Sequence, residues 1–449
     1  MEDKYGEIFE KLVKGYYNNQ FEDTYHEIMN NDLKEEENPK EILLALCGVK
    51  ESKAEKEHHF YQELVNGITN QRVRNKIVQK VRSCTSDCES VDGKSKCQTV
   101  CPFDAIVKDG EKGEKRINDE LCMSCGRCVI ACEKGNYLDT KEFLPALELL
   151  KENKEVFAMV APAIAGQFGE DVTLDMLREA FISIGFRDMV EVALGADVLT
   201  VKEALEFDRQ VEKPEDCMIS SCCCPIWVAA LKRVYNSLIK DVSPSVSPMI
   251  AMARILKKLN PGCKVVFVGP CIAKKQEAKE PDLIGDVDFV ITFQELQEIF
   301  AALEVDVTKL KGLPTVEYAA RGGRLYGRAG GVSQAVWDVV DQLLPEKRKL
   351  FTSIHVDGMK NCKDILTQLE NGEKRATFIE GMACPGGCAG GPKRNIDVEK
   401  GTEAVNRFAN DSEIKIPVHS EVMRELLYQI GVEDIKELAE CAIFERKFE

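Results

Sequence analysis

The spacing of apolar residues along the chain changes near residue 150. Before that point, apolar side chains recur at helical intervals in EIFEKLVKGYY (7–17) and in FYQELVNGITNQRVRNKIVQKV (60–81). Such spacing predicts amphipathic helices, because residues three and four apart share one face of a helix. We therefore predict a helical N-terminal extension over residues 1–80, whose role the sequence does not disclose.

After residue 150, short apolar runs rich in β-branched residues alternate with longer amphipathic stretches. Runs such as VFAMV (156–160), VVFVG (265–269) and ATFIEGM (376–382) predict buried strands, and TLDMLREAFISIG (173–185) predicts a helix. Alternation of this kind favours mainly parallel sheets flanked by helices. We expect an α/β domain over residues 141–449.

Composition narrows the class of protein. The chain has 449 residues, enough for two or three domains at about 150 residues each. Its formal net charge of -16 argues against a nucleic-acid partner, because phosphate binding needs a basic surface. No apolar run of about 18 residues predicts a membrane span, and the charged N-terminus does not resemble a secretory signal. We expect a cytoplasmic protein.

The 19 cysteines are distributed unevenly. Eight lie between Cys84 and Cys132, three stand together at 222–224, and two close the run CPGGC at 384–388. In a reducing compartment such cysteines are more often metal ligands or catalytic thiols than members of disulfides. The later motifs follow predicted strands, and open α/β sheets place their sites beyond the carboxyl ends of strands. We expect these motifs to converge in one cleft.

Residues 81–140 combine dense cysteines with too few large apolar residues for a core of their own, so this segment needs metal to fold. Their spacings, C-x3-C-x8-C-x3-C and then C-x2-C-x2-C-x3-C, resemble the two-cluster bacterial ferredoxins. Zinc ribbons use paired C-x2-C knuckles instead. The resemblance implies crossed ligand sets for two 4Fe-4S clusters: Cys84, Cys88, Cys97 and Cys132 for one, and Cys122, Cys125, Cys128 and Cys101 for the other. An eight-residue insertion, and Glu133 in place of proline, depart from the ferredoxin pattern.

Three further runs resemble the catalytic domain of FeFe-hydrogenases over roughly residues 140–395. They are SSCCCPIW (220–227), GPCIAKKQE (269–277) and EGMACPGGC (380–388), in the order of that family. The resemblance implies a two-lobed domain that binds an H-cluster, a 4Fe-4S cube bridged to a diiron unit with CO, cyanide and azadithiolate. The implied cube ligands, with Cys388 as the bridge, are Cys224, Cys271, Cys384 and Cys388.

The same resemblance implies a proton path that runs Glu203, Ser243, Glu206 and Cys223. The two glutamates are three residues apart in TVKEALE and share a helix face. A cysteine suits proton transfer because its neighbours can move its pKa. The triple cysteine allows two registers. Counting back from Pro225 gives the roles above, whereas counting forward from the two serines would move both cysteine roles one residue earlier.

Residues that would surround the diiron unit are also implied by the resemblance. Lys274 would place an ammonium against a cyanide ligand, with Glu277 as a partner for a buried charge. The remaining residues expected near the cofactor are Ala161, Pro162, Met382 and Tyr326.

Three positions differ from the better-known hydrogenases: Gly269 stands where those have Met, Ala163 where those often have Ser, and Cys222 where Ser is more frequent. The triple cysteine resembles the less-studied group B. The resemblance implies an anaerobic oxidoreductase that interconverts protons and H2, takes electrons from ferredoxin or a similar small carrier, and needs maturation proteins. The alternatives are a sensory hydrogenase with slow turnover and a non-catalytic iron–sulfur assembly protein.

Overall fold

The computed structural model describes residues 4–54, 56–71, 73–84, 88, 93–109, 114–153, 155–220, 223–315 and 318–448. The chain divides into two compact units. The first contains residues 1–154 together with 271–276 and 289–306, and the second contains 155–270, 277–288 and 307–449. The predicted boundaries at residues 80 and 140 stay a prediction.

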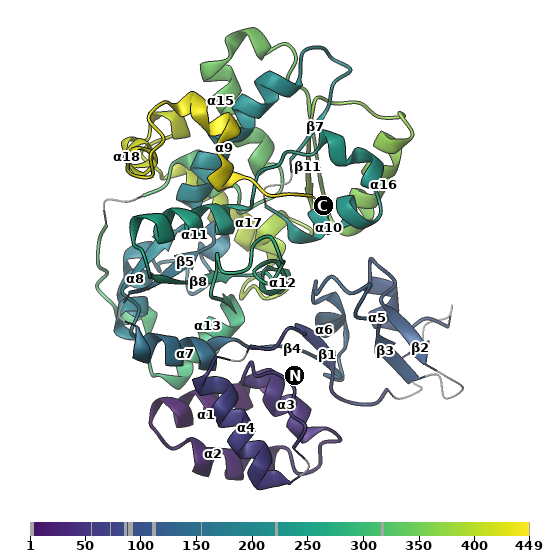
Figure 1. Ribbon diagram of the computed structural model, residues 1–449, viewed down its shortest axis with the longest axis vertical. Coiled ribbons are helices and arrows are strands. Elements are labelled where there is room, and N and C mark those ends of the chain that lie inside the picture. The colour runs from purple at the N-terminus through teal and green to yellow at the C-terminus, as the bar shows by residue number, and fades with distance from the viewer. Residues whose placement is uncertain are drawn as a thin grey trace. The chain divides into compact units, whose positions relative to one another are not determined.

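The first unit begins with helices, seen in purple in Figure 1. Helix α1 buries Ile8, Phe9, Leu12 and Val13, which recur on one face as the apolar spacing predicts. Helix α1 packs against α7 and α13, and α4 packs against α7. The helices of this unit are α1 Lys4–Tyr17, α2 Phe21–Glu27, α3 Pro39–Leu46, α4 Glu57–Thr69, α5 Lys96–Val100, α6 Arg127–Ala131, α7 Phe143–Glu152 and α13 Phe293–Ala302.

The helical prediction over 60–81 is wrong beyond residue 69. Helix α4 ends at Thr69, and Gln71 adopts a left-handed φ of 51°, which a continuing helix does not permit. Residues Val78–Lys80 form strand β1, which pairs antiparallel with β4, Tyr137–Asp139. A second antiparallel pair joins β2, Ile106–Asp109, to β3, Glu114–Ile117. Backbone pairing across the chain therefore outweighs the local helical spacing.

The second unit contains two parallel sheets, as the strand–helix alternation predicts. In one, β5 Val156–Val160 lies between β6 Asp188–Glu191 and β8 Lys264–Gly269. In the other, β11 Phe378–Met382 lies between β10 Ser353–Asp357 and β7 Met218–Ile219. The fold is therefore of the α/β class.

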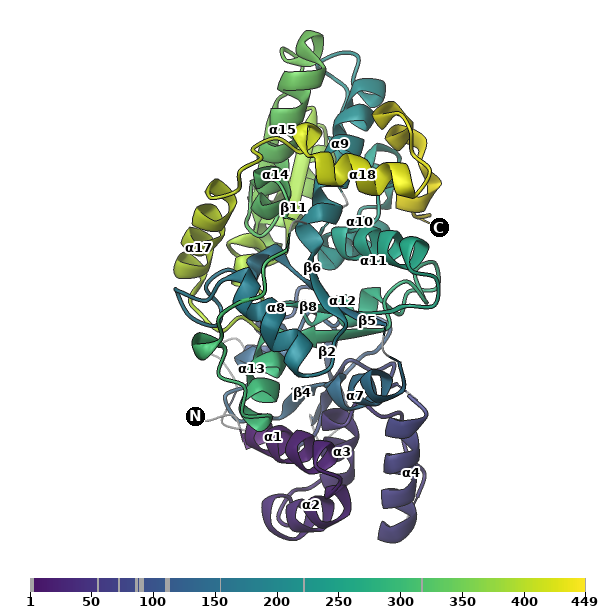
Figure 2. The same ribbon diagram turned by 90° about the vertical axis from the view of Figure 1, so that its left-hand side faces the viewer.

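Helix α9 (Val192–Gln210) is buried along most of its length and packs against α11, α14 and α15. Figure 2 shows it among these neighbours. The other α-helices of this unit are α8 Leu174–Ser183, α10 Pro225–Arg233, α11 Pro248–Leu259, α14 Arg321–Leu325, α15 Gly331–Leu343, α16 Met359–Glu370, α17 Val398–Asn410 and α18 Glu421–Gln429. The short helix α12, Ala273–Glu277, belongs to the first unit except for its last residue.

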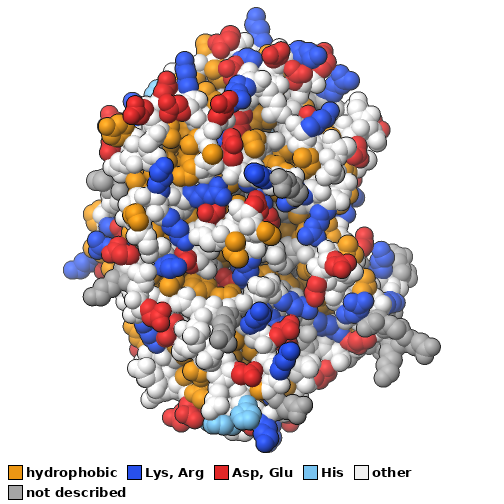
Figure 3. All heavy atoms as spheres, viewed as in Figure 1, with side chains coloured by type: hydrophobic (Ala, Val, Ile, Leu, Met, Phe, Trp, Pro, Cys, Tyr) orange, Lys and Arg blue, Asp and Glu red, His pale blue; other side chains and the backbone are white. Residues whose placement is uncertain are grey.

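The surface carries both signs of charge. On the face drawn in Figure 3, Lys and Arg side chains are interspersed with Asp and Glu. Within the part of the chain that the structure describes, no helix is both long enough and apolar enough to cross a membrane.

Candidate functional site

Four cysteine thiols of the first unit come together at the second ferredoxin-like motif. Burial, together with the nearby thiols of Cys101 and Cys122, raises the pKa of Cys125 to about 12, and a backbone hydrogen bond at Arg127 opposes this rise. Burial also raises the pKa of Cys128, and the largest contributions after it come from Cys125, Cys122 and Cys101. These four are the predicted ligands of one cluster. Because burial raises the pKa of Cys122, Cys125 and Cys128, these three thiols need a bound cation to become thiolates.

The two halves of the ferredoxin-like segment repeat one local arrangement. Cys101 is the C-cap of α5, and its Sγ accepts the Ala105 N–H at 3.3 Å. Cys132 is the C-cap of α6, and its Sγ accepts the Asn136 N–H at 3.4 Å. A peptide N–H aimed at sulfur stabilises a thiolate. Helices α5 and α6 also pack against one another.

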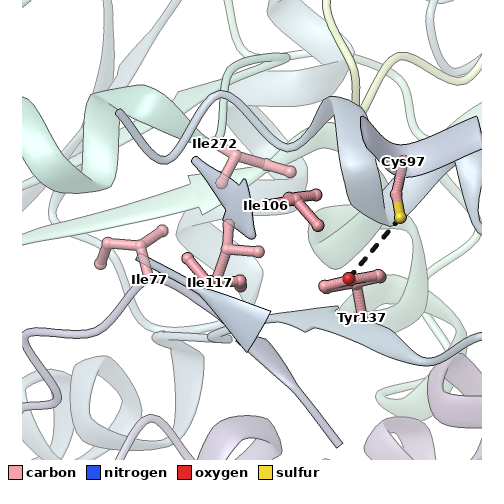
Figure 4. Packing of buried hydrophobic residues seen from close by; sticks show 7 residues of the cluster. Ile77, Cys97, Ile106, Ile117, Tyr137 and Ile272 are labelled. Atoms are coloured by element: carbon pink, nitrogen blue, oxygen red, sulfur yellow. Dashed lines mark hydrogen bonds between the residues drawn. The ribbon is translucent and has the colours of Figure 1, made fainter. Parts of the chain in front are cut away.

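The other predicted ligand set is partly brought together around Tyr137. The Sγ of Cys97 lies 3.6 Å from the Tyr137 hydroxyl, drawn as a dashed line in Figure 4. Burial raises the pKa of Tyr137, and Cys97 and Cys84 raise it further, which places Cys84 nearby. The Cys88 thiol lies near the exposed Lys96.

The small core of this segment includes Ile272, the residue after Cys271. Ile272 is fully buried with Ile106, Ile117 and Tyr137, as Figure 4 shows. Gly126 lies between Cys125 and Cys128 with φ +73°, and a Cβ there would stand 2.3 Å from the Ile272 Cδ1. The segment therefore completes its core with residues from outside 81–140, which include Ile77, Val78 and Ile272.

Lys275, which the sequence did not single out, anchors the same short segment. Its side chain is fully buried, and its Nζ lies 2.8 Å from the Glu295 Oε2 and 2.5 Å from the Thr140 carbonyl oxygen. Glu295 also belongs to the capping box that begins α13. A buried ammonium with these partners fixes residues 271–276 within the first unit.

In the second unit, the predicted cysteine motifs follow parallel strands. Strands β7 and β11 pair in register from Met218 opposite Phe378, so their carboxyl ends meet at one sheet edge. Cys224 is the N-cap of α10, and its Sγ accepts the Ala383 N–H at 3.4 Å, one residue before Cys384. Cys388 lies in the short 3-10 helix Gly387–Gly390. The structure thus brings Cys224 against the loop that carries Cys384 and Cys388.

Two glycines shape that loop. Gly386 and Gly387 both have φ +76°, which favours glycine. A Cβ on Gly387 would lie 2.4 Å from the Ala329 backbone nitrogen and 2.8 Å from the Met382 Sδ. The backbone therefore turns tightly between the two cysteines, beside the buried Met382.

Trp227 positions the first cysteine run. Its indole N–H donates to the Ser220 carbonyl oxygen at 2.9 Å. A Cβ on Gly381 would lie 2.3 Å from its ring, so the tryptophan packs flat against β11. Ser221 and Cys222 lie outside the described residues.

The third motif follows β8, as predicted. Pro270 precedes Cys271, and its carbonyl oxygen accepts the Lys393 N–H at 3.0 Å. A Cβ on Gly269 would stand 2.7 Å from the Phe267 ring and 3.3 Å from the Ala161 Cβ. The Phe267 ring therefore occupies the space that a larger residue at 269 would need.

The two glutamates of α9 are buried and bonded to serines. Ser220 Oγ donates to the Glu203 carboxylate at 3.0 Å. Ser243 Oγ donates to the Glu206 Oε2 at 2.7 Å, and Ser245 Oγ lies 3.3 Å from its Oε1. The Ser243 N–H donates to the Ile219 carbonyl oxygen, which ties this serine to the end of β7.

These contacts bear on the order of the path, which stays a prediction. The sequence placed Glu206 next to Cys223. However, the carboxylate bonded to Ser220, three residues before Cys223, is that of Glu203. Glu206 instead meets Lys202, a fully buried cation at 2.5 Å that the sequence did not identify. Helical spacing places both glutamates on one face but does not say which end of that face meets the cysteines.

The remaining predicted residues are buried except Pro162, which is partly exposed. Thr200 Oγ1 donates to the Tyr326 hydroxyl oxygen at 3.0 Å, and the Ala161 N–H donates to the Val268 carbonyl oxygen at 2.8 Å. Glu277 is 2% exposed. Burial lowers the pKa of Arg446, but the carboxylates of Glu280 and Glu277 help to raise it above its ordinary value. Lys274 is 6% exposed, and Pro162 begins the 3-10 helix Pro162–Ile164.

Over the described residues, no three His, Cys, Asp or Glu side chains converge on one metal ion. A 4Fe-4S cube makes a different demand, since it takes one thiolate on each of four irons.

Comparison with known proteins decides the family. Residues 154–392, more than half of the chain, match the model of the iron-only hydrogenase large subunit, C-terminal domain. The chain belongs to the iron-only hydrogenase family. All three motifs of the catalytic resemblance fall inside the matched range.

Relatives of two kinds resemble this hydrogenase-family chain. The NADP-reducing hydrogenase subunit HndD of Solidesulfovibrio fructosivorans is 28% identical over 68% of this chain and 63% of its own length. The cytosolic iron-sulfur assembly component 3 of Mus musculus is 25% identical over 66% of this chain and 75% of its own length. The chain thus spans less than two thirds of HndD.

The fold of the hydrogenase family is also found in solved structures. FeFe-hydrogenase HydA1 from Chlamydomonas reinhardtii aligns with a TM-score of 0.53 at 23% identity, over 64% of this chain and 94% of that one. At this identity the likeness concerns the fold.

Proposed function

We propose that this protein is an FeFe-hydrogenase, which catalyses the reversible conversion of two protons and two electrons to H2 at an H-cluster. The observation that carries the proposal is the pair of buried carboxylates on α9, each bonded to a serine, that leads toward the cysteine run. A buried carboxylate is costly unless it is paired or hydrogen-bonded, and two such groups bonded to serine hydroxyls on one helix suit proton transfer.

The donor set fits the cofactor. Cys224, Cys384 and Cys388 are thiols on loops at strand ends, and a backbone N–H already points at the Cys224 sulfur. Together with Cys271 they would hold the cube, and the bound H-cluster would supply the iron centre at which protons and electrons combine. Lys274, Glu277, Ala161, Pro162, Met382 and Tyr326 would surround it.

The chain's own part in the reaction is to move protons. The contacts of the two glutamates support the order Glu206, Ser243, Glu203 and Cys223. A proton would pass from Glu206 to Glu203 through the hydroxyl of Ser243, which accepts one proton as it gives up another. Glu203, held by Ser220, would then deliver a proton to the Cys223 thiol. Glu206, Ser243 and Glu203 are buried, and hydrogen bonds in a low-dielectric interior hold such groups in place for transfer.

The ferredoxin-like segment would carry the electrons. Two 4Fe-4S clusters, held by the crossed cysteine sets, would connect a surface carrier such as ferredoxin to the active site. Maturation proteins would insert the diiron unit, in an anaerobic cytoplasm. The triple cysteine, and Gly269 beside Phe267, support placement in group B.

A second candidate follows from the likeness to the mouse iron–sulfur assembly component, which would make the chain a non-catalytic cluster protein. A sensory hydrogenase is a third. Protein loaded with clusters and then with the diiron unit distinguishes them. For a hydrogenase we expect infrared bands of metal-bound CO and cyanide, together with H2 turnover from a reduced dye.

Failure to show those bands after loading would favour the assembly protein. Bands without sustained turnover would favour the sensory form. Cys441→Ser is a matched control for substitutions of the proposed ligand cysteines, since Cys441 belongs to no proposed ligand set and lies in the C-terminal segment.

A further inference from the structure

Lys202 is a buried cation shared by two carboxylates. It is 0% exposed, and its Nζ lies 2.5 Å from the Glu206 Oε1 and 3.3 Å from the Glu445 Oε1. Its third contact is the Ala439 carbonyl oxygen at 3.3 Å. An ammonium offers three hydrogens, so all three are directed to oxygen.

The C-terminal tail is held at this place by backbone pairing. Ser245 forms an antiparallel bridge with Glu445, the Val246 N–H donates to the Phe444 carbonyl oxygen at 2.9 Å, and the Arg446 N–H donates to that of Pro244 at 2.8 Å. The Arg254 guanidinium also donates to the Glu445 carbonyl oxygen at 2.9 Å. In Figure 1 the yellow C-terminal chain runs beside α9. Glu445 therefore lies on a segment that pairs with the segment that carries Ser243 and Ser245.

Glu445 is the most exposed of these residues. In the order in which they contact one another, the side chains of Glu206, Lys202 and Glu445 are 7%, 0% and 35% exposed. Glu445 thus joins the buried pair to solvent. The other charged groups around the tail have partners of their own: Arg446 pairs with Glu280 and Asp282, Arg254 with Asp286, and Arg209 with Glu440.

We propose that Glu445 is the surface end of the proton path and that Lys202 connects it to Glu206. The inference rests on the proposed function. In one transfer the Lys202 ammonium gives a proton to the Glu206 carboxylate and regains one from the Glu445 carboxylic acid. Glu445 becomes a carboxylate, Glu206 becomes an acid and Lys202 ends as it began, so charge and protons balance. Solvent then reprotonates Glu445.

The decisive variant is Glu445→Ala in the loaded enzyme, with Glu440→Ala as control. Glu440 lies on the same C-terminal segment but is 78% exposed and pairs with Arg209 instead. With saturating electron supply, we expect Glu445→Ala to lower H2 turnover at least about tenfold at neutral pH, as the loss of a proton-transfer group does. A small carboxylic acid such as acetic acid should restore turnover in that variant, and Glu445→Asp should retain most of it.

A structural role for Glu445 would not be rescued by a small acid, so loss of turnover without rescue overturns the inference. Equal behaviour of the two alanine variants overturns it as well.

The two proposals fail differently. A wild type without CO and cyanide bands rejects the hydrogenase, and the tail's role is rejected with it. A wild type with bands and turnover, beside an unaffected Glu445→Ala, rejects only the role of the tail.

Discussion

The Ile272 side chain lies directly against the backbone of Gly126, where an added Cβ would come within 2.3 Å of its Cδ1. Ile272 follows Cys271, a proposed ligand of the active-site cube. Gly126 lies between Cys125 and Cys128, two proposed ligands of a ferredoxin-like cluster. A contact with no room for a methyl group holds these two segments in one arrangement.

Gly126→Ala should therefore disturb this arrangement. The φ of +73° costs an alanine about 1 kcal/mol, and the contact with Ile272 adds to that. Gly93→Ala is the matched control, since Gly93 has φ +70° and no atom within 4 Å of its added Cβ. We expect a lower thermal midpoint and slower electron delivery in Gly126→Ala than in Gly93→Ala. Equal thermal midpoints in the two variants would show that the Ile272 side chain moves aside without loss of stability.

The register of the triple cysteine can be tested by iron content. Cys224→Ser should lose the active-site cube, whereas Cys223→Ala should keep its iron and lose turnover by about 10²-fold or more. Cys222→Ser should keep the cube. If Cys223 proves to be the residue whose loss costs iron, the register moves one residue toward the N-terminus.

Asp197 should make stability depend on pH. Burial raises its pKa well above the ordinary value, against backbone N–H donors at Ala320 and Gly323 that lower it. A carboxyl group with a raised folded-state pKa contributes stability that is fully present below its unfolded pKa of about 3.9 and is lost as pH rises through the folded value.

The measurement for Asp197 is the urea midpoint of the wild type minus that of Asp197→Asn, followed from about pH 5 to 8. The asparagine does not titrate, so the difference should fall as pH rises. A difference that stays constant over this range would mean that the donors outweigh burial and that this carboxyl is held ionised.

Gly269→Met should be destabilising, although better-known hydrogenases have Met at this position. The new Cβ would stand 2.7 Å from the Phe267 ring, and overpacking of this kind costs about 1–3 kcal/mol. Adding Phe267→Ala should recover part of the loss in urea unfolding, because the removed ring leaves room for the methionine. If the double variant is no more stable than Gly269→Met, the Phe267 ring is not what excludes a larger residue at position 269.

Part of this protein can be predicted from its sequence because the signals are local. Apolar runs of strand length predicted β5, β8 and β11, and the cysteines after β8 and β11 follow from position along the chain. Neither depends on distant residues. The spacing of Glu203 and Glu206 likewise placed both on one helix face, since the helical repeat fixes that relation.

Only the tertiary structure decided which partners those residues meet. Ser220 and Ser243 come from segments 17 and 37 residues away from the glutamates they contact, and Glu445 reaches Lys202 from the other end of the chain. No local period encodes such contacts, because they depend on how strands and tail pair. The sequence therefore determined the fold class and the family, and the packing of α9 decided which side chains its buried glutamates and lysine contact.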